Sequence, residues 1–163
     1  MANTQSMCTS FMQQLMVGEH QLGTATLVSR TSLTAPTTDT LKAALYLASA
    51  TVNASTTAYS ASNEVSGTGY VAGGVTVTNA TAPNSTNASA TAGVAFFTPS
   101  ASITYTTVTL ATAFDAVLLY NSTQSDKAIS VHTFGSQTIT AGTFTLTMPS
   151  NTTTTALIRL ATT

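Results

Sequence analysis

Charged side chains are scarce in this sequence. Of its 163 residues, 4 are Lys or Arg and 5 are Asp or Glu, so charged residues make up 6%, whereas ordinary soluble domains have about a quarter. Binding to nucleic acid needs clustered Lys and Arg that displace counterions, and here the basic residues are spread along the chain. We therefore expect no nucleic-acid partner. The basic residues are Arg30, Lys42, Lys127 and Arg159.

Long apolar runs and cysteine pairs are also missing. No apolar stretch approaches the roughly 18 residues that a membrane-spanning helix needs, so we expect no membrane partner. The N-terminus has neither the cationic nor the continuous apolar segment of a signal peptide, which argues against one. The single cysteine, Cys8, cannot form an internal disulfide. We interpret it as a structural thiol and not as a nucleophile.

The sequence does contain enough apolar residues to fold. Hydrophobic residues make up 43%, the net charge is −1 and the mean hydropathy is +0.25. Disordered chains usually combine low hydrophobicity with high net charge, which is the opposite pattern. The length suffices for one domain with a hydrophobic core. Because so few charges keep copies apart, the composition suits a subunit of an assembly.

One segment, "SFMQQLM", has the pattern of a short amphipathic helix. Ser10 followed by Gln13 fits a capping box, and Gly18 fits a C-terminal stop. Two apolar pairs at i, i+4 spacing share one flank. So short a helix is not stable alone, so it either packs on its own domain or docks on a partner, and both interpretations stay open. The candidate interface residues are Phe11, Met12, Leu15 and Met16.

From residue 41 onward the chain has the pattern of many short β-strands. "TLKAALYLAS" fits a helix or a strand, and Lys42 and Tyr46 on one face favour the strand. Further strands are predicted at "GGVTVTNAT", "AGVAFFTP", "ITYTTVTL", "DAVLLYN", "KAISVHTFG", "GTFTLTMP" and "TALIRLA", since they are rich in β-branched and aromatic residues. Turn signals separate them at Pro83-Asn84, Pro99-Ser100, Asn121-Ser122, Gly135-Ser136 and Pro149-Ser150.

Many short strands with regular turns predict an all-β fold, an antiparallel β-sandwich or barrel that is jelly-roll-like. We expect an N-terminal arm over residues 1–40, with a short helix and a loop, and a β-sandwich domain over residues 41–163. Residues 79–93 are small, polar and of low complexity, which predicts an exposed loop.

Four glycines crowd into "NEVSGTGYVAGGVTV" and raise the question of a phosphate-binding loop. A dinucleotide fingerprint needs a third glycine where this chain has Ala72, and a following helix where this chain predicts a strand. A Walker loop needs a lysine, and none lies between Lys42 and Lys127. We predict instead that the glycines supply positive φ angles and close backbone approach at a turn or bulge. They are Gly67, Gly69, Gly73 and Gly74.

Motifs for catalysis and metal binding are not found. The histidines, His20 and His132, are isolated, there is no G-x-S-x-G elbow, and no two acidic residues are paired in sequence. Two histidines and one cysteine give no metal-ligand spacing. We therefore predict that the protein is not an enzyme and that it uses no cofactor and no metal.

Several segments together resemble a family of small structural virion proteins of tailed bacteriophages. They are "FMQQLMVGEHQL", "DTLKAALYLASATVNASTTAYSASNEVSGTGYVAGGVTV", "AVLLYNSTQSDKAISVHTFGS", "GTFTLTMP" and "TALIRLA", and the resemblance runs over nearly the whole length of the chain. The most specific block contains Tyr59, Glu64, Gly67, Gly69, Tyr70, Gly73 and Gly74. The resemblance implies a β-rich virion component, by analogy a head decoration or cement protein, and it implies no catalytic residue or ligand.

Two functions are therefore expected as alternatives. The first is a capsid decoration or cement protein, made in the host cytoplasm, that binds the outer capsid surface of the virion and stabilises the head. Its partners would be the major capsid protein and copies of itself, with a trimer fitting threefold positions. The alternative is a tail, neck or fibre-associated protein that acts as an adaptor or binds a host-surface glycan. Its available aromatic residues would be Tyr59, Tyr70, Tyr105 and Tyr120, of which Tyr120 is expected to lie largely in the core.

Overall fold

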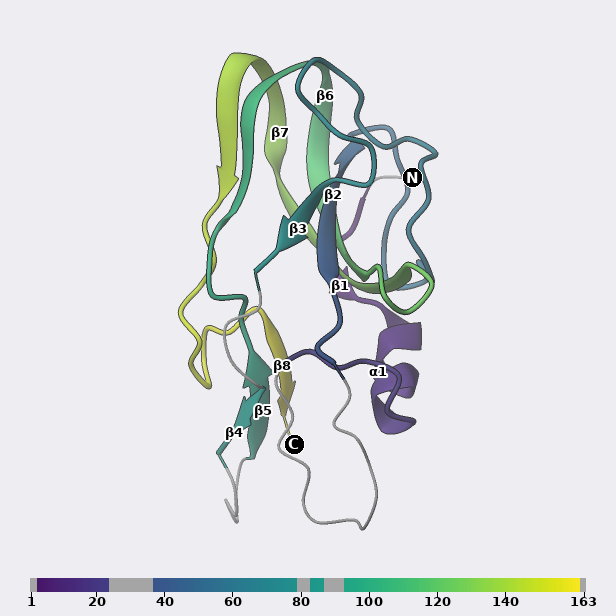
Figure 1. Ribbon diagram of the computed structural model, residues 1–163, viewed down its shortest axis with the longest axis vertical. Coiled ribbons are helices and arrows are strands. Elements are labelled where there is room, and N and C mark those ends of the chain that lie inside the picture. The colour runs from purple at the N-terminus through teal and green to yellow at the C-terminus, as the bar shows by residue number, and fades with distance from the viewer. Residues whose placement is uncertain (1–2, 24–36, 79–82, 87–92, 162–163) are drawn as a thin grey trace.

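The computed structural model describes residues 3–23, 37–78, 83–86 and 93–161. Over these ranges it contains two antiparallel sheets, ordered β1-β7-β6-β2-β3 and β4-β5-β8, and one short helix (Figure 1). The predicted all-β fold with a short N-terminal helix is confirmed. The elements are β1 Ser6–Met7, α1 Thr9–Met16, β2 Leu41–Leu47, β3 Val75–Val77, β4 Asn84–Ser85, β5 Val94–Phe97, β6 Ile103–Asn121, β7 Lys127–Leu146 and β8 Ile158–Ala161.

Strand β2 confirms the strand interpretation of the ambiguous segment and explains the ambiguity. It lies between β6 and β3, with Leu41 opposite both Asn121 and Val77. Five of its seven residues are buried, because both faces of this central strand are covered. A strand buried on both faces lacks the alternation that separates strand from helix in a sequence.

The strands β6 and β7 correct the predicted strand boundaries. Four separate short strands were expected here, but "ITYTTVTL" and "DAVLLYN" form one strand of 19 residues, and "KAISVHTFG" and "GTFTLTMP" form one of 20. The predicted turn at Gly135-Ser136 is wrong, because β7 runs through it. The expected turn at Asn121-Ser122 is present, since residues 122–126 join the two strands.

The β6–β7 ribbon folds over on itself instead of ending. Figure 1 shows the two strands rising together, turning over at the top of the view and descending in a second layer. The ring of Phe144, from the descending part, lies 5.2 Å from that of Phe114 and 5.1 Å from that of Phe134. Several register shifts accompany the bend, and bulges of this kind let one strand pass from one layer to the other.

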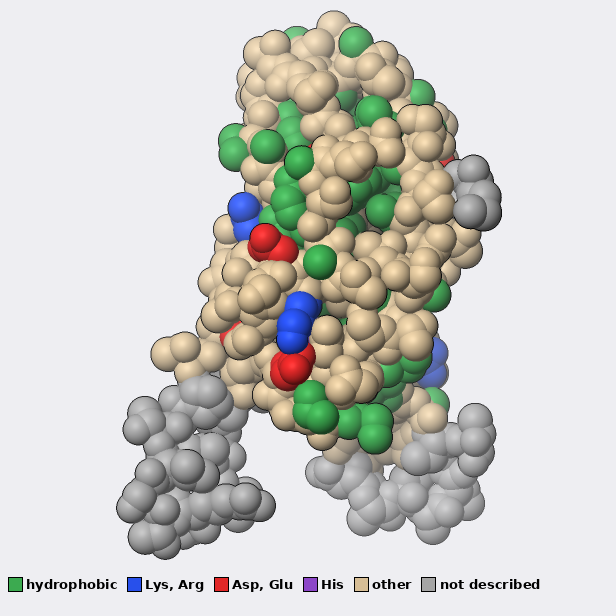
Figure 2. Space-filling model, turned by 90° about the vertical axis from the view of Figure 1, so that its right-hand side faces the viewer, with side chains coloured by type: hydrophobic (Ala, Val, Ile, Leu, Met, Phe, Trp, Pro, Cys, Tyr) green, Lys and Arg blue, Asp and Glu red, His purple; other side chains and the backbone are tan. Residues whose placement is uncertain are grey.

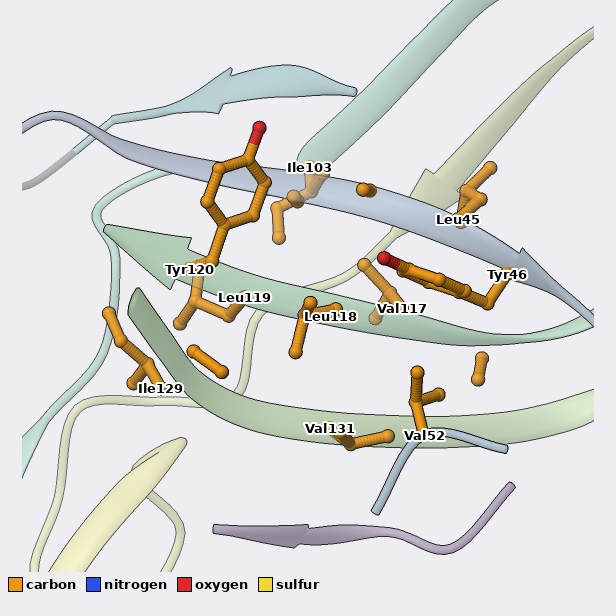
Figure 3. Packing of buried hydrophobic residues seen from close by; sticks show 14 of the residues in the cluster. Leu45, Tyr46, Val52, Ile103, Val117, Leu118, Leu119, Tyr120, Ile129 and Val131 are labelled. Carbon is orange, nitrogen blue, oxygen red and sulfur yellow. The ribbon is translucent and has the colours of Figure 1, made fainter. Parts of the chain in front are cut away.

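The hydrophobic core lies between these layers and against the helix. Figure 3 shows side chains of β2, β6 and β7 packed together, among them Leu45, Leu118 and Val131, all fully buried. The small sheet contributes Phe97 and Ile158 to the same cluster. A second predicted turn, Pro83-Asn84, is also corrected, because Asn84 belongs to β4 and pairs with Phe96.

The described part of the N-terminal arm is continuous with the sheet and the core. Strand β1 pairs with β7, and the Cys8 amide donates to the carbonyl of Ile129 at 2.9 Å. Cys8 and Phe11 are fully buried. The boundary predicted at residue 40 stays a prediction. Residues 24–36 of the arm and most of the loop predicted over 79–93 lie outside the described residues. No helix in the described ranges is long and apolar enough to cross a membrane.

Candidate functional site

Helix α1 has one buried face and one exposed face, and the four predicted interface residues divide between them. Phe11 is fully buried and belongs to the core, and Leu15 is partly buried against it. Met12 is 42% exposed and Met16 is 88% exposed, and Val17 after the helix is 60% exposed. Phe11 thus packs on its own domain, and the prediction that the four residues form an interface stays a prediction. We call Met12, Met16 and Val17 the exposed helix face.

The ends of α1 show why its faces are fixed. Gly18 has a φ of 75°, its amide donates to Leu15, and the next amide donates to Gln14, so the predicted glycine stop is confirmed as a Schellman motif. The predicted capping box is wrong. The N-cap residue is Cys8, which makes no side-chain cap hydrogen bond, and the Ser10 hydroxyl is buried without a partner.

An apolar groove lies beside the helix, where α1 meets the small sheet. It has a volume of about 260 Å³ and is bordered by Leu15, Phe96 and Leu160, with Leu160 itself 40% exposed. Figure 2 shows exposed hydrophobic side chains at the lower end of the face that carries α1, below a pair of oppositely charged side chains. Exposed apolar side chains next to an apolar groove are typical of a protein-binding surface.

The glycine-rich block lies against the backbone of β6 and β2, as predicted. A Cβ on Gly67 would lie 2.0 Å from the Thr109 carbonyl oxygen, and one on Gly74 would lie 1.7 Å from the Ala43 carbonyl oxygen. Gly69, Gly73 and Gly74 have φ angles of 78°, 85° and 71°, a region in which residues with a Cβ are strained. These glycines permit close packing and form no phosphate loop.

This close packing brings all five tyrosines of the chain around the Glu64 carboxylate. Tyr59 and Tyr70 donate from their hydroxyls to the two carboxylate oxygens at 2.6 and 2.7 Å, and the Gly73 amide donates to Glu64 Oε1 at 2.8 Å. Tyr120 donates to the Gly73 carbonyl at 2.7 Å. We call the set the tyrosine cluster: Tyr46, Tyr59, Tyr70, Tyr105, Tyr120 and Glu64.

The remaining tyrosines tie the cluster to the sheet and to the next loop. Tyr105 donates to the Ala43 carbonyl at 2.8 Å, and Tyr46 donates to the Ser60 carbonyl. The rings of Tyr59 and Tyr120 stack at 4.8 Å, as do those of Tyr70 and Tyr105 at 5.8 Å. Burial and the nearby carboxylate raise the pKa of all five hydroxyls, that of Tyr120 to about 12, so all remain protonated donors.

The tyrosine cluster changes the interpretation of the aromatics offered for glycan binding. Tyr105 and Tyr120 are each 2% exposed, and Tyr59 and Tyr70 are partly buried against the core. The expectation that Tyr120 lies in the core is confirmed. These rings hold the block of residues 59–74 on the sheet and form no exposed aromatic platform.

A second buried polar group surrounds His20. Its Nε2 donates to Gln14 Oε1 at 2.8 Å, and its Nδ1 accepts from Asn121 Nδ2 at 2.9 Å, which fixes a neutral tautomer. Asn121 Nδ2 also donates to Asp39 Oδ2 at 2.6 Å. Burial lowers the pKa of His20, although Asp39 partly opposes the shift. Because both ring nitrogens are engaged, the group ties the arm to the β6 terminus and leaves no nitrogen for proton transfer.

The other histidine lies within hydrogen-bond distance of a serine. Ser130 Oγ and His132 Nε2 are 2.9 Å apart, which is the separation of a nucleophile and its base. However, Ser130 is 3% exposed, burial lowers the pKa of His132 to about 4, and no carboxylate of the described residues hydrogen-bonds to His132. A cavity of about 110 Å³ adjoins His132, and a second pocket of about 330 Å³ borders both Ser130 and His132. Because Ser130 is buried and no described carboxylate orients the imidazole, the pair has the geometry of a satisfied buried contact.

Comparison with protein-family models, with curated proteins and with solved structures gives no match for this chain. The resemblance to virion proteins therefore stays a prediction. In the described ranges, no three His, Cys, Asp or Glu side chains lie close enough to hold a metal ion.

Proposed function

We propose that this protein is a structural subunit of a tailed-bacteriophage virion, a decoration or cement protein that binds the outer capsid surface. The observation that carries the proposal is the exposed helix face. Phe11 anchors α1 in the core, while Met12, Met16 and Val17 project from a surface that carries few charges. A short helix held this rigidly is suited to present a docking surface.

The chemistry of this face fits an apolar protein partner. Methionine side chains are flexible and polarisable and adapt to irregular grooves. Burying one such side chain contributes about 1.5–3 kcal/mol, so each copy would gain a modest amount from the capsid. Many copies on a symmetric lattice would together stabilise the head, because each joins neighbouring capsid subunits. The partners in this proposal are the major capsid protein and copies of the chain itself.

Copy number per virion is the first test of the proposal. Quantitative mass spectrometry of purified particles, against the major capsid protein, is expected to give hundreds of copies. A capsid lattice offers that many equivalent positions, whereas the tail and the unique vertex allow only small rings. A count of about a dozen or fewer would favour the tail, neck or fibre role and would end the cement proposal.

A variant pair then tests the docking surface. Met12→Asp combined with Met16→Asp places two charges on the exposed helix face, and we expect at least a tenfold loss of binding to capsids that lack the protein. Because both side chains are exposed, the β-sheet circular dichroism should be unchanged. The matched control is Val71→Asp, since Val71 is 70% exposed in the glycine-rich block. Equal loss of binding in the control, or none in the double variant, would contradict docking through α1.

A further inference from the structure

The outer edge of β7 is a long strand edge without a partner in the described structure. Strand β1 pairs with β7 only at Ser130 and Val131. From Thr133 to Leu146, β7 pairs with β6 on one side, and none of its backbone groups bonds to another described element on the other side. In Figure 1 the end of β7 lies at the outer margin of the molecule. We call residues 133–146 the outer edge of β7.

This edge has register shifts at its bend, but it lacks three other features with which proteins usually prevent strands from pairing between molecules. Strand edges that are protected in this way carry charged side chains, above all lysine, or contain proline, or are very short. Between Lys127 and Arg159 the chain has no charged residue, and between Lys127 and Pro149 it has no proline. The exposed side chains of the edge are small or polar and uncharged: Gly135, Ser136, Gln137, Thr138, Thr140, Ala141, Thr143 and Thr145.

The length of the edge points to its occupant. The other described strands at the edges of the sheets have two to four residues: β1, β3, β4 and β8. None of them could satisfy the backbone groups of an edge this long. The β7 edge of a second copy has the same length, and two uncharged strands meet without repulsion, so self-pairing satisfies the most donors and acceptors.

The bend of the ribbon also fits a second copy. A straight strand from another protein could not follow an edge that turns over near residues 135–141. A second copy related by a twofold axis through the bend has the same curvature, so both arms of the two edges stay in register. Such an interface is self-complementary, and the two strands run antiparallel.

We propose that two copies of this chain associate by antiparallel pairing of their β7 outer edges across a twofold axis near Thr138. The pairing continues the large sheet from one molecule into the next. It uses a surface other than the exposed helix face, so it does not depend on capsid binding. It gives a twofold building block instead of the trimer expected above.

Light scattering coupled to size-exclusion chromatography tests the pairing with the full chain. The wild-type protein is expected to have about twice the chain's mass of 16.6 kDa, and Thr138→Lys is expected to be monomeric because it places a charge at the centre of the edge. The control is Thr112→Lys, at an exposed position of β6, the inner strand of the same bend, which should remain dimeric. A monomeric wild type over a hundredfold concentration range would overturn the proposal, and so would a dimeric Thr138→Lys.

Cysteine cross-linking tests the geometry. Residues near a twofold axis face their own copies, so Thr138→Cys should form a disulfide-linked dimer on oxidation, while Thr133→Cys and Thr145→Cys at the ends should not. Cys8 gives little background, because it is buried and its thiol pKa is raised to about 11. Cross-linking at the ends as well as the centre would indicate parallel pairing and contradict the proposal. If Met12→Asp with Met16→Asp is monomeric and Thr138→Lys is not, the dimer forms through the helix face.

Discussion

The tyrosine cluster and the outer edge of β7 are both built from uncharged donors, and they differ in where those donors find acceptors. In the tyrosine cluster every hydroxyl has a partner within the chain, and Glu64 accepts three hydrogen bonds. At the outer edge the outward backbone groups of residues 133–146 have no partner among the described residues. The chain thus uses hydroxyl and backbone hydrogen bonds where other proteins use charges.

This difference separates the tyrosine cluster, which stabilises the fold, from the outer edge of β7, which is available for association with another copy. Buried polar groups that are fully satisfied make the packing specific, and a half-satisfied group is costly. The tyrosine cluster is therefore expected to respond strongly to substitution. Side chains at the outer edge are solvated, so substitutions there should change association and leave the free energy of unfolding almost unchanged.

The largest effect on the free energy of unfolding is expected from Gly74→Ala, at the contact between the glycine-rich block and β2. The new Cβ would lie 1.7 Å from the Ala43 carbonyl oxygen and 2.8 Å from the Ala44 Cα, so β3 would have to move away from the central strand. We expect the free energy of unfolding to fall by at least about 4 kcal/mol, among the largest single-site effects. Urea unfolding followed by circular dichroism measures it.

Two other glycines are controls for this variant. Gly18→Ala has the same positive φ but open space, so it should cost about 1 kcal/mol. Gly135→Ala lies at the outer edge of β7 with no positive φ and nothing within 4 Å of the new Cβ, so it should change stability by less than about 0.5 kcal/mol. Equal losses at all three positions would show that the close approach at Gly74 is not what matters.

The strands could largely be predicted from the sequence, but their continuity could not. Alternation and β-branched residues located β2, β3, β5, β6, β7 and β8, since these signals are local, but they did not locate the two-residue strands β1 and β4. The break predicted at Gly135-Ser136 came from the same kind of local signal, which does not distinguish a reversal from a bend. Whether a strand continues depends on its neighbour, and β6 bends together with β7.

The candidate sites were less predictable because they depend on distant residues. The i, i+4 pairs of α1 located a helix, but they did not show that Phe11 faces the sheet and Met16 the solvent. The glycines were correctly interpreted from Ala72 and the following strand. That Tyr46 and Tyr120 lie in one cluster has no sequence signal, since it follows from the pairing of β2 with β6.

The second prediction concerns the acceptor at the centre of the tyrosine cluster. Glu64→Ala removes the acceptor of Tyr59, Tyr70 and the Gly73 amide at once. An unsatisfied buried donor costs about 1–3 kcal/mol, and Tyr59 can reach water, so we expect a loss of about 2–4 kcal/mol in urea unfolding. Glu64→Gln keeps the shape and one oxygen, and its loss should be smaller.

A surface acid provides the control for Glu64. Glu19 forms an ion pair with Lys127 on the surface, and such pairs contribute about 0–1 kcal/mol. Glu19→Ala should therefore cost much less than Glu64→Ala. If the two losses in free energy of unfolding were equal, removal of an acidic residue from a nearly neutral chain would explain both. The hydrogen bonds of the tyrosine cluster would then not account for the effect of Glu64→Ala.

The response to acid separates the two regions most directly. Burial lowers the pKa of His132 from 6.5 to about 4 and lowers that of His20 in the same direction. Between pH 6.5 and pH 4 the unfolded chain therefore binds protons that the folded chain does not, so the free energy of unfolding falls as the pH is lowered through this window. One pKa unit corresponds to about 1.4 kcal/mol, so a shift from 6.5 to about 4 contributes at most about 3.5 kcal/mol. His132→Gln should remove that part of the slope in urea unfolding at pH 7 and pH 4.5.

The outer edge of β7 has no titratable side chain, so the fraction of dimer should be the same at pH 7 and pH 4.5 wherever the protein is folded. A dimer that dissociates before the fold weakens would mean that a charged or titratable group, and not the neutral strand edge, holds the two copies together.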